Sequence, residues 1–141
     1  MKESIHIQNF GPIIDVNIKD IKPFTVFIGK SGSGKSTVVK LIALFRWIYK
    51  MMCIRTFLKQ SGVKKTFRFR MDTYLKNNEQ DNFVRKDTHI EYKYGTITIM
   101  FDGKQLYGTN EFIPQKEMSL EKISFIADRR VAISDIQAGS L

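Results

Sequence analysis

One nine-residue stretch constrains this chain more than any other. Residues 29–37 read Gly-Lys-Ser-Gly-Ser-Gly-Lys-Ser-Thr and fit the pattern G-x-x-x-x-G-K-[ST]. Glycines at 29, 32 and 34 allow a sharp turn that brings backbone N–H groups close to an anion, because no side chain intervenes. The spacing therefore predicts a loop that wraps around phosphate groups.

The polar residues of this loop suit a nucleotide with several phosphates. Lys35 can place a compact positive charge on the β- and γ-phosphates, and the Ser36 hydroxyl can bind a bridging Mg²⁺. Thr37 falls in the first turn of a following helix, whose N-terminal partial positive charge attracts anions. We predict Lys35 as the catalytic residue and Ser36 as the metal ligand. The full set of predicted binding residues is Gly29, Lys30, Ser31, Gly32, Ser33, Gly34, Lys35, Ser36 and Thr37.

The flanking segments have the order that such a loop needs. Residues 24–28 form a short β-branched and aromatic run typical of a buried strand, and residues 36–59 contain neither Gly nor Pro. Apolar residues recur there every three or four positions, which predicts a long helix packed on a sheet. Its other face would carry an exposed row of cations, namely Lys40, Arg46, Lys50 and Arg55.

Alternating polar and apolar residues predict an antiparallel β layer. Residues 4–10 and 14–18 read as one hairpin across Gly11-Pro12, and residues 90–107 as further strands with a turn at Asp102-Gly103. We predict a strand at 123–127, and a loop or short helix within 71–88. Together these segments indicate an α/β fold: a phosphate-loop lobe with a mixed sheet, an antiparallel β layer and a long helix after the loop.

The alternation of Phe67 and Phe69 with Arg68 and Arg70 has two interpretations. Aromatic and basic residues in alternation can stack on and neutralise single-stranded nucleic acid. The same pattern also describes a strand with one apolar and one charged face, and we favour the strand.

Composition suits a single domain spanning residues 1–141. The net charge of +9 is regional, since residues 40–93 hold 13 Lys or Arg and 5 Asp or Glu. A basic region of this kind indicates DNA or RNA as a partner, with a solvated face or an acidic protein as alternatives.

A few features of the sequence indicate the cellular compartment of the protein. The single cysteine, Cys53, allows no intramolecular disulfide and reads as a small buried group, and the N-terminus lacks an apolar signal segment. Three cations interrupt the apolar stretch 38–54, which argues against a membrane span. We expect a cytoplasmic protein with no membrane partner.

Four separated segments resemble the N-terminal lobe of ABC-type ATPases. They are 7–13 with its Asn-Phe-Gly-Pro turn, 24–29, 31–37 and, more loosely, 125–129. The chain is similar to bacterial AAA-like proteins related to the structural maintenance of chromosomes, RecF and overcoming-lysogenization-defect families. This resemblance implies ATP and Mg²⁺ as cofactors and a head-to-tail dimer with a second ATPase lobe or head.

Other motifs of the resembled family find no clear match. A Leu-Ser-Gly-Gly signature and a switch histidine are missing from the sequence, and Arg129 follows Asp128 where a catalytic glutamate would stand. Met100-Phe101-Asp102 imitates the acidic strand end, although a turn explains it better. Gln137 is the one candidate for the γ-phosphate-sensing glutamine. We therefore expect an ATP-binding lobe of a nucleic-acid-linked ATPase, with negligible hydrolysis by the chain alone.

Two alternatives remain at this point. The chain could be a small P-loop kinase that transfers phosphate from ATP to a nucleotide or metabolite, with Asp128 as acid/base or magnesium contact and Arg129 and Arg130 on phosphates. It could also be a binding-only remnant module whose basic face meets an acidic protein. The predicted antiparallel segments argue against the kinase, because such enzymes have mostly parallel sheets.

Overall fold

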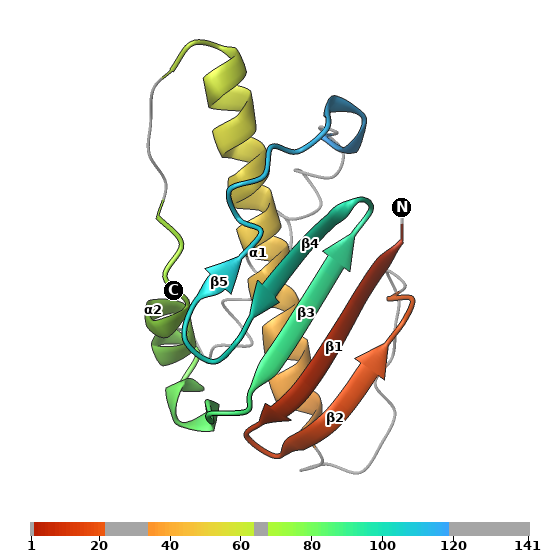
Figure 1. Ribbon diagram of the computed structural model, residues 1–141, viewed down its shortest axis with the longest axis vertical. Coiled ribbons are helices and arrows are strands. Elements are labelled where there is room, and N and C mark those ends of the chain that lie inside the picture. Colours follow the sequence, from red (N-terminus) through yellow and green to blue (C-terminus); the bar gives the residue numbers. More distant parts are fainter. Residues whose placement is uncertain (1, 22–33, 64–67, 119–141) are drawn as a thin grey trace.

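An antiparallel sheet forms one layer of the protein and a long helix forms the other (Figure 1). The computed structural model describes residues 2–21, 34–63 and 68–118. The sheet has the strand order β2-β1-β3-β4-β5, and every neighbouring pair is antiparallel. Its strands are β1 Glu3–Phe10, β2 Ile13–Ile18, β3 His89–Tyr94, β4 Ile97–Phe101 and β5 Leu106–Tyr107.

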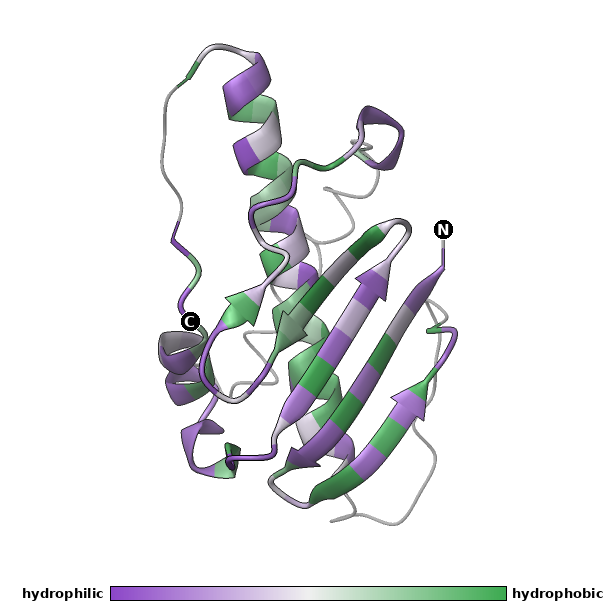
Figure 2. Cartoon of the chain, viewed as in Figure 1, coloured by the Kyte–Doolittle hydropathy of each residue, from purple (hydrophilic) through white to green (hydrophobic). Residues whose placement is uncertain are grey.

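Strand alternation decides which face of the sheet is buried. In β1 the apolar Ile5 and Ile7 are buried, whereas Ser4 and His6, which alternate with them, are half-buried. Figure 2 shows the same alternation of hydrophobic and hydrophilic positions along the central strands. Successive side chains of a strand point to opposite faces, so this pattern gives the sheet one face for a core. His6 lies on the other face, where its Nε2 lies 2.7 Å from Asp15 Oδ1.

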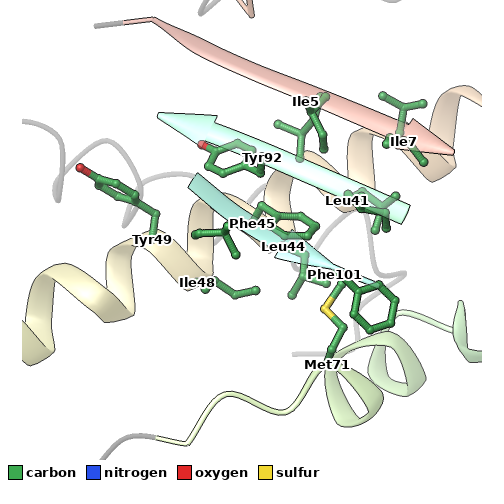
Figure 3. Packing of buried hydrophobic residues seen from close by; sticks show 14 of the residues in the cluster. Ile5, Ile7, Leu41, Leu44, Phe45, Ile48, Tyr49, Met71, Tyr92 and Phe101 are labelled. Carbon is green, nitrogen blue, oxygen red and sulfur yellow. The ribbon is translucent and has the colours of Figure 1, made fainter. Parts of the chain in front are cut away.

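Helix α1, Lys35–Gln60, covers the apolar face of the sheet. Its buried stripe includes every apolar position that the periodicity singled out: Val38, Leu41, Ile42, Phe45, Ile48, Tyr49 and Met52. Figure 3 shows Leu41 and Phe45 on the side of α1 that faces β1 and β3, and the Phe45 ring stacks on the Tyr92 ring with centroids 5.6 Å apart. Cys53 is also buried, as predicted.

The predicted row of exposed cations along α1 is wrong. Arg46 is part-buried and binds the carboxylate of Glu3 through Nε and Nη2, at 2.7 and 2.6 Å. Lys50 and Arg55 are only 7% and 6% exposed. Helical spacing identified which residues share this second face, but the face is covered by other segments of the chain.

Arg55 shows how that second face is covered. Its Nη2 donates to the Glu111 carbonyl oxygen at 2.7 Å, and its guanidinium lies 5.8 Å from the centre of the Phe69 ring. Burial lowers the pKa of Arg55. Both partners come from segments that follow the helix in sequence, so no pattern within α1 could have revealed them.

Short elements fill the connections. Helix α2 spans Met71–Asn77 and a 3₁₀ turn, η1, spans Asp81–Phe83, within the region 71–88 where a loop or short helix is predicted. A second 3₁₀ turn, η2, spans Gln115–Glu117. The strand predicted for 64–70 is wrong in its described part, because residues 68–70 lie in no strand and Arg70 caps α2. The predicted strands 24–28 and 123–127 lie outside the described residues.

The region of β4 and β5 contains the predicted turn. The Asp102 carboxylate accepts hydrogen bonds from the backbone N–H groups of Lys104 and Gln105, at 2.9 and 3.0 Å. These two bonds, followed by one from the Tyr107 hydroxyl, lower the pKa of Asp102. Asp102 thus stabilises the turn, which accounts for an acidic residue directly after Met100 and Phe101.

In the described ranges no helix is long and apolar enough to cross a membrane.

Candidate functional site

Gly34, the last glycine of the loop motif, has a conformation that requires glycine. Its φ is +84°, in the left-handed region, and it precedes the first residue of α1. A Cβ at this position would lie 3.3 Å from Ile13 Cγ1 and 3.6 Å from Pro12 Cγ. Gly34 therefore lies close against the β1–β2 connection.

The beginning of α1 is electropositive. Its first turn contains no acidic residue, and no side chain caps it. The first intrahelical hydrogen bond is donated by the Val38 N–H to the Gly34 carbonyl at 3.0 Å, so the helix itself offers no acceptor to the N–H groups before Val38. Ser36 is exposed, Lys35 is half-buried and Thr37 is buried. A helix end of this kind favours an anionic ligand.

The other predicted loop residues cannot be placed. Gly29, Lys30, Ser31, Gly32 and Ser33 lie outside the described residues. The same holds for the acid, arginines and glutamine that were singled out beyond residue 118: Asp128, Arg129, Arg130 and Gln137. The structure thus brings together four of the nine predicted binding residues, Gly34 to Thr37, at one end of α1.

A distant segment, residues 78–88, packs against this end of the helix, and sequence reasoning missed it. Gln80 is 1% exposed, and its Nε2 donates to the Thr37 carbonyl oxygen at 3.5 Å. Lys40 Nζ donates to the Asn78 carbonyl at 3.3 Å. The Oε1 atom of Gln80 has no hydrogen-bond partner within the described part of the chain. No local signal predicts these contacts, because about forty residues separate the partners.

The 78–88 segment is also hydrogen-bonded to the β1–β2 turn. The Gly11 N–H donates to the Phe83 carbonyl at 2.9 Å, and the Arg85 side chain donates to the Gly11 carbonyl. Gly11 has a φ of +57°, and a Cβ there would lie 2.5 Å from the Phe83 ring. The turn, the start of α1 and the segment therefore lie at the same end of the sheet (Figure 1).

The described residues at this end fit a polyphosphate. The first turn of α1 adds no carboxylate to repel an anion, and Ser36 is exposed. Within the described ranges, no group of three His, Cys, Asp or Glu residues could hold a metal ion by itself.

A helix that begins with Lys35, Ser36 and Thr37 directly after Gly34 matches the last part of the phosphate-loop pattern G-x-x-x-x-G-K-[ST]. Comparison with protein families agrees: the model of the AAA ATPase domain matches residues 1–133. The chain belongs to this family of AAA-like P-loop ATPases, which bind ATP and typically use Mg²⁺. Neither the curated proteins nor the solved structures gave a significant match.

Proposed function

We propose that this chain is the MgATP-binding lobe of an ABC-type ATPase, and that residues 29–37 form its phosphate-binding (Walker A) loop. One observation carries the proposal: Lys35, Ser36 and Thr37 open helix α1 directly after a left-handed Gly34, in a chain of the AAA ATPase domain family. ATP supplies the phosphoanhydride chemistry when bound. Lys35 would hold the β- and γ-phosphates, Ser36 would ligate Mg²⁺, and residues 29–34 would offer backbone N–H groups.

We further propose that hydrolysis requires a second lobe and a head-to-tail pair of heads. The resemblance of segments 7–13, 24–37 and 125–129 to the structural maintenance of chromosomes, RecF and overcoming-lysogenization-defect families supports this arrangement. Hydrolysis by this lobe alone is then negligible. The proposed setting is the cytoplasm, where the thiol of the buried Cys53 stays reduced.

The antiparallel sheet favours this reading over a kinase. Each of the four described strand pairings is antiparallel, whereas small P-loop kinases are built on mostly parallel sheets.

MgATP is expected to raise the melting temperature of the full chain, because a ligand that binds only the folded state stabilises it. At a ligand concentration one hundred times Kd, the stabilisation is about 2.7 kcal/mol. The measurement is a thermal melt with MgATP, and with adenosine as a control that lacks phosphates. An unchanged melting temperature at millimolar MgATP, also in the presence of the second lobe, would contradict the proposal.

We also propose DNA or RNA as a partner of the basic region 40–93. Burial of Arg46, Lys50 and Arg55 removes three of its cations from contact with a partner. Arg68 and Arg70 are exposed, and Arg70 forms an ion pair with Asp72 at the protein surface. These two arginines, on either side of Phe69, therefore make the best-supported contact with a polyanion.

Replacing Arg68 and Arg70 with alanine is expected to weaken binding to single-stranded DNA and to lower its salt dependence. Each lost phosphate contact reduces the slope of log K against log [salt] by about 0.7 for single strands. A fluorescence anisotropy titration at several salt concentrations measures both quantities. The matched control is Lys104→Ala with Lys116→Ala, which removes two exposed cations elsewhere. If both double variants lose affinity equally, the contact is not at Arg68 and Arg70.

A further inference from the structure

A cation outside the loop motif, Arg85, binds the β1–β2 turn at the end of the sheet where α1 begins. The Nη2 of Arg85 donates a hydrogen bond to the Gly11 carbonyl oxygen, and the Arg85 side chain is exposed. No carboxylate within the described residues forms an ion pair with it. A guanidinium has five N–H donors, so the bond to Gly11 leaves most of them available.

The β1–β2 turn connects this cation to the end of α1. Gly11 accepts the Arg85 bond, and the side chains of the next two residues, Pro12 and Ile13, are those that a Cβ at Gly34 would meet. Two residues of chain span at most about 7 Å. Arg85 and the last glycine of the loop are therefore in contact with the same short turn, and no third element has to be crossed between them.

The position of Arg85 is fixed by contacts on both sides. The Arg85 backbone N–H donates to Thr88 Oγ1 at 2.7 Å, and the Phe83 ring packs edge-on against Phe10 with centroids 5.6 Å apart. Gln80 of the same segment binds the first turn of α1 through the Thr37 carbonyl. A cation held in this way loses little freedom when it binds an anion, which favours affinity.

We propose that Arg85 contacts the phosphate chain of the nucleotide bound at the start of α1, as a second cation beside Lys35. This inference rests on the proposed function and deepens it. The ligand class is a nucleoside polyphosphate, and the contact reads phosphates and not the base. A planar guanidinium suits this task, because it can bind two phosphate oxygens at once.

Arg85→Gln tests the charge of Arg85 separately from its hydrogen bond to the Gly11 carbonyl. Glutamine can still donate a hydrogen bond to the Gly11 carbonyl but has no charge. We expect about a tenfold weaker affinity for MgATP, the size of one hydrogen bond to a charged group, with little change in melting temperature. MgGTP should lose affinity by the same factor. Titration with a fluorescent nucleotide analogue measures both, and Lys86→Ala, the neighbouring exposed cation, is the matched control.

A second measurement uses the unaltered protein. MgATP is expected to protect Arg85 from an arginine-selective reagent such as phenylglyoxal, while the exposed Arg70 reacts equally with and without nucleotide. Mass spectrometry of peptides from the full chain gives the extent of modification at each site. This readout does not depend on the folding of a variant.

The outcomes separate this inference from the proposed function. Wild-type affinity in Arg85→Gln, equal modification of Arg85 with and without MgATP, or a loss that differs between ATP and GTP would overturn the role of Arg85. The first two of these results, together with lost binding in Lys35→Ala, would leave the proposed function standing. Failure of the wild-type chain to bind MgATP would overturn both.

Discussion

Lys35→Ala is expected to weaken MgATP binding about a hundredfold, because a hydrogen bond to a charged group contributes about 1.5–3 kcal/mol. Lys35 is the first residue of α1 and directly follows Gly34, so its charge adds to that of the helix N-terminus. The substitution removes no apolar core residue, and the melting temperature without nucleotide should stay close to that of the wild type. Isothermal titration with MgATP measures the affinity.

Lys59→Ala is the matched control for this experiment. It makes the same chemical change in the same helix, but in the last turn, where Lys59 Nζ lies 4.9 Å from the centre of the Phe112 ring. Its affinity for MgATP should equal that of the wild type. If Lys35→Ala also binds as tightly as the wild type, the phosphate-loop interpretation of residues 29–37 is wrong.

Glu3→Gln is expected to lower the free energy of unfolding by about 3–5 kcal/mol, the usual cost of breaking a buried ion pair by removing one partner. The Glu3 and Arg46 side chains are 7% and 11% exposed, and the Tyr92 hydroxyl also donates to the Glu3 carboxylate. Burial would lower the pKa of Arg46, but the hydrogen bonds and charge of Glu3 raise it overall. Urea denaturation measures the change.

Glu91→Gln provides the control for this second experiment. Glu91 pairs with Lys93 at 3.2 Å in the same sheet, with side chains 30% and 54% exposed. An exposed pair contributes at most about 1 kcal/mol. Equal losses in the two variants would mean that the Glu3–Arg46 pair contributes no more than a surface pair does. A triple variant, Glu3→Leu with Arg46→Met and Tyr92→Phe, should be more stable than Glu3→Gln, because it leaves no polar partner buried alone.

Local patterns predicted the parts of the fold that local physics controls. Alternation in β1 and the Asp102-Gly103 turn indicated antiparallel strands, since strand side chains alternate between faces and turn residues need particular backbone angles. The apolar spacing in α1 identified the face that packs on the sheet. The alternation in Phe67–Arg70 led to a wrong strand prediction for residues 68–70. Phe69 packs against the core from a segment without regular secondary structure, which gives the same alternating pattern as a strand.

The candidate site also has one part that the sequence predicted and one part that it did not. The loop motif is contiguous, so the sequence alone singled out residues 29–37 and the chemistry that they suit. Arg85 and Gln80 lie more than forty residues further on and were not predicted. They come to the start of α1 because the 78–88 segment is hydrogen-bonded to both Gly11 and Thr37. Pairings of this kind depend on how the chain folds back, and they leave no local pattern.

The sequence by itself determined the phosphate-loop motif, the apolar face of α1 and the antiparallel strands, because each depends on the spacing of near neighbours. Only the tertiary structure decided which cations of α1 are buried and which are exposed. Helical spacing places Arg46 and Arg55 on a face that would be exposed to solvent. In the structure, Arg46 donates to the Glu3 carboxylate and Arg55 to the Glu111 backbone carbonyl, and both acceptors are distant in sequence. Burying a charge is costly without such partners, and the partners are set by the packing of the whole chain.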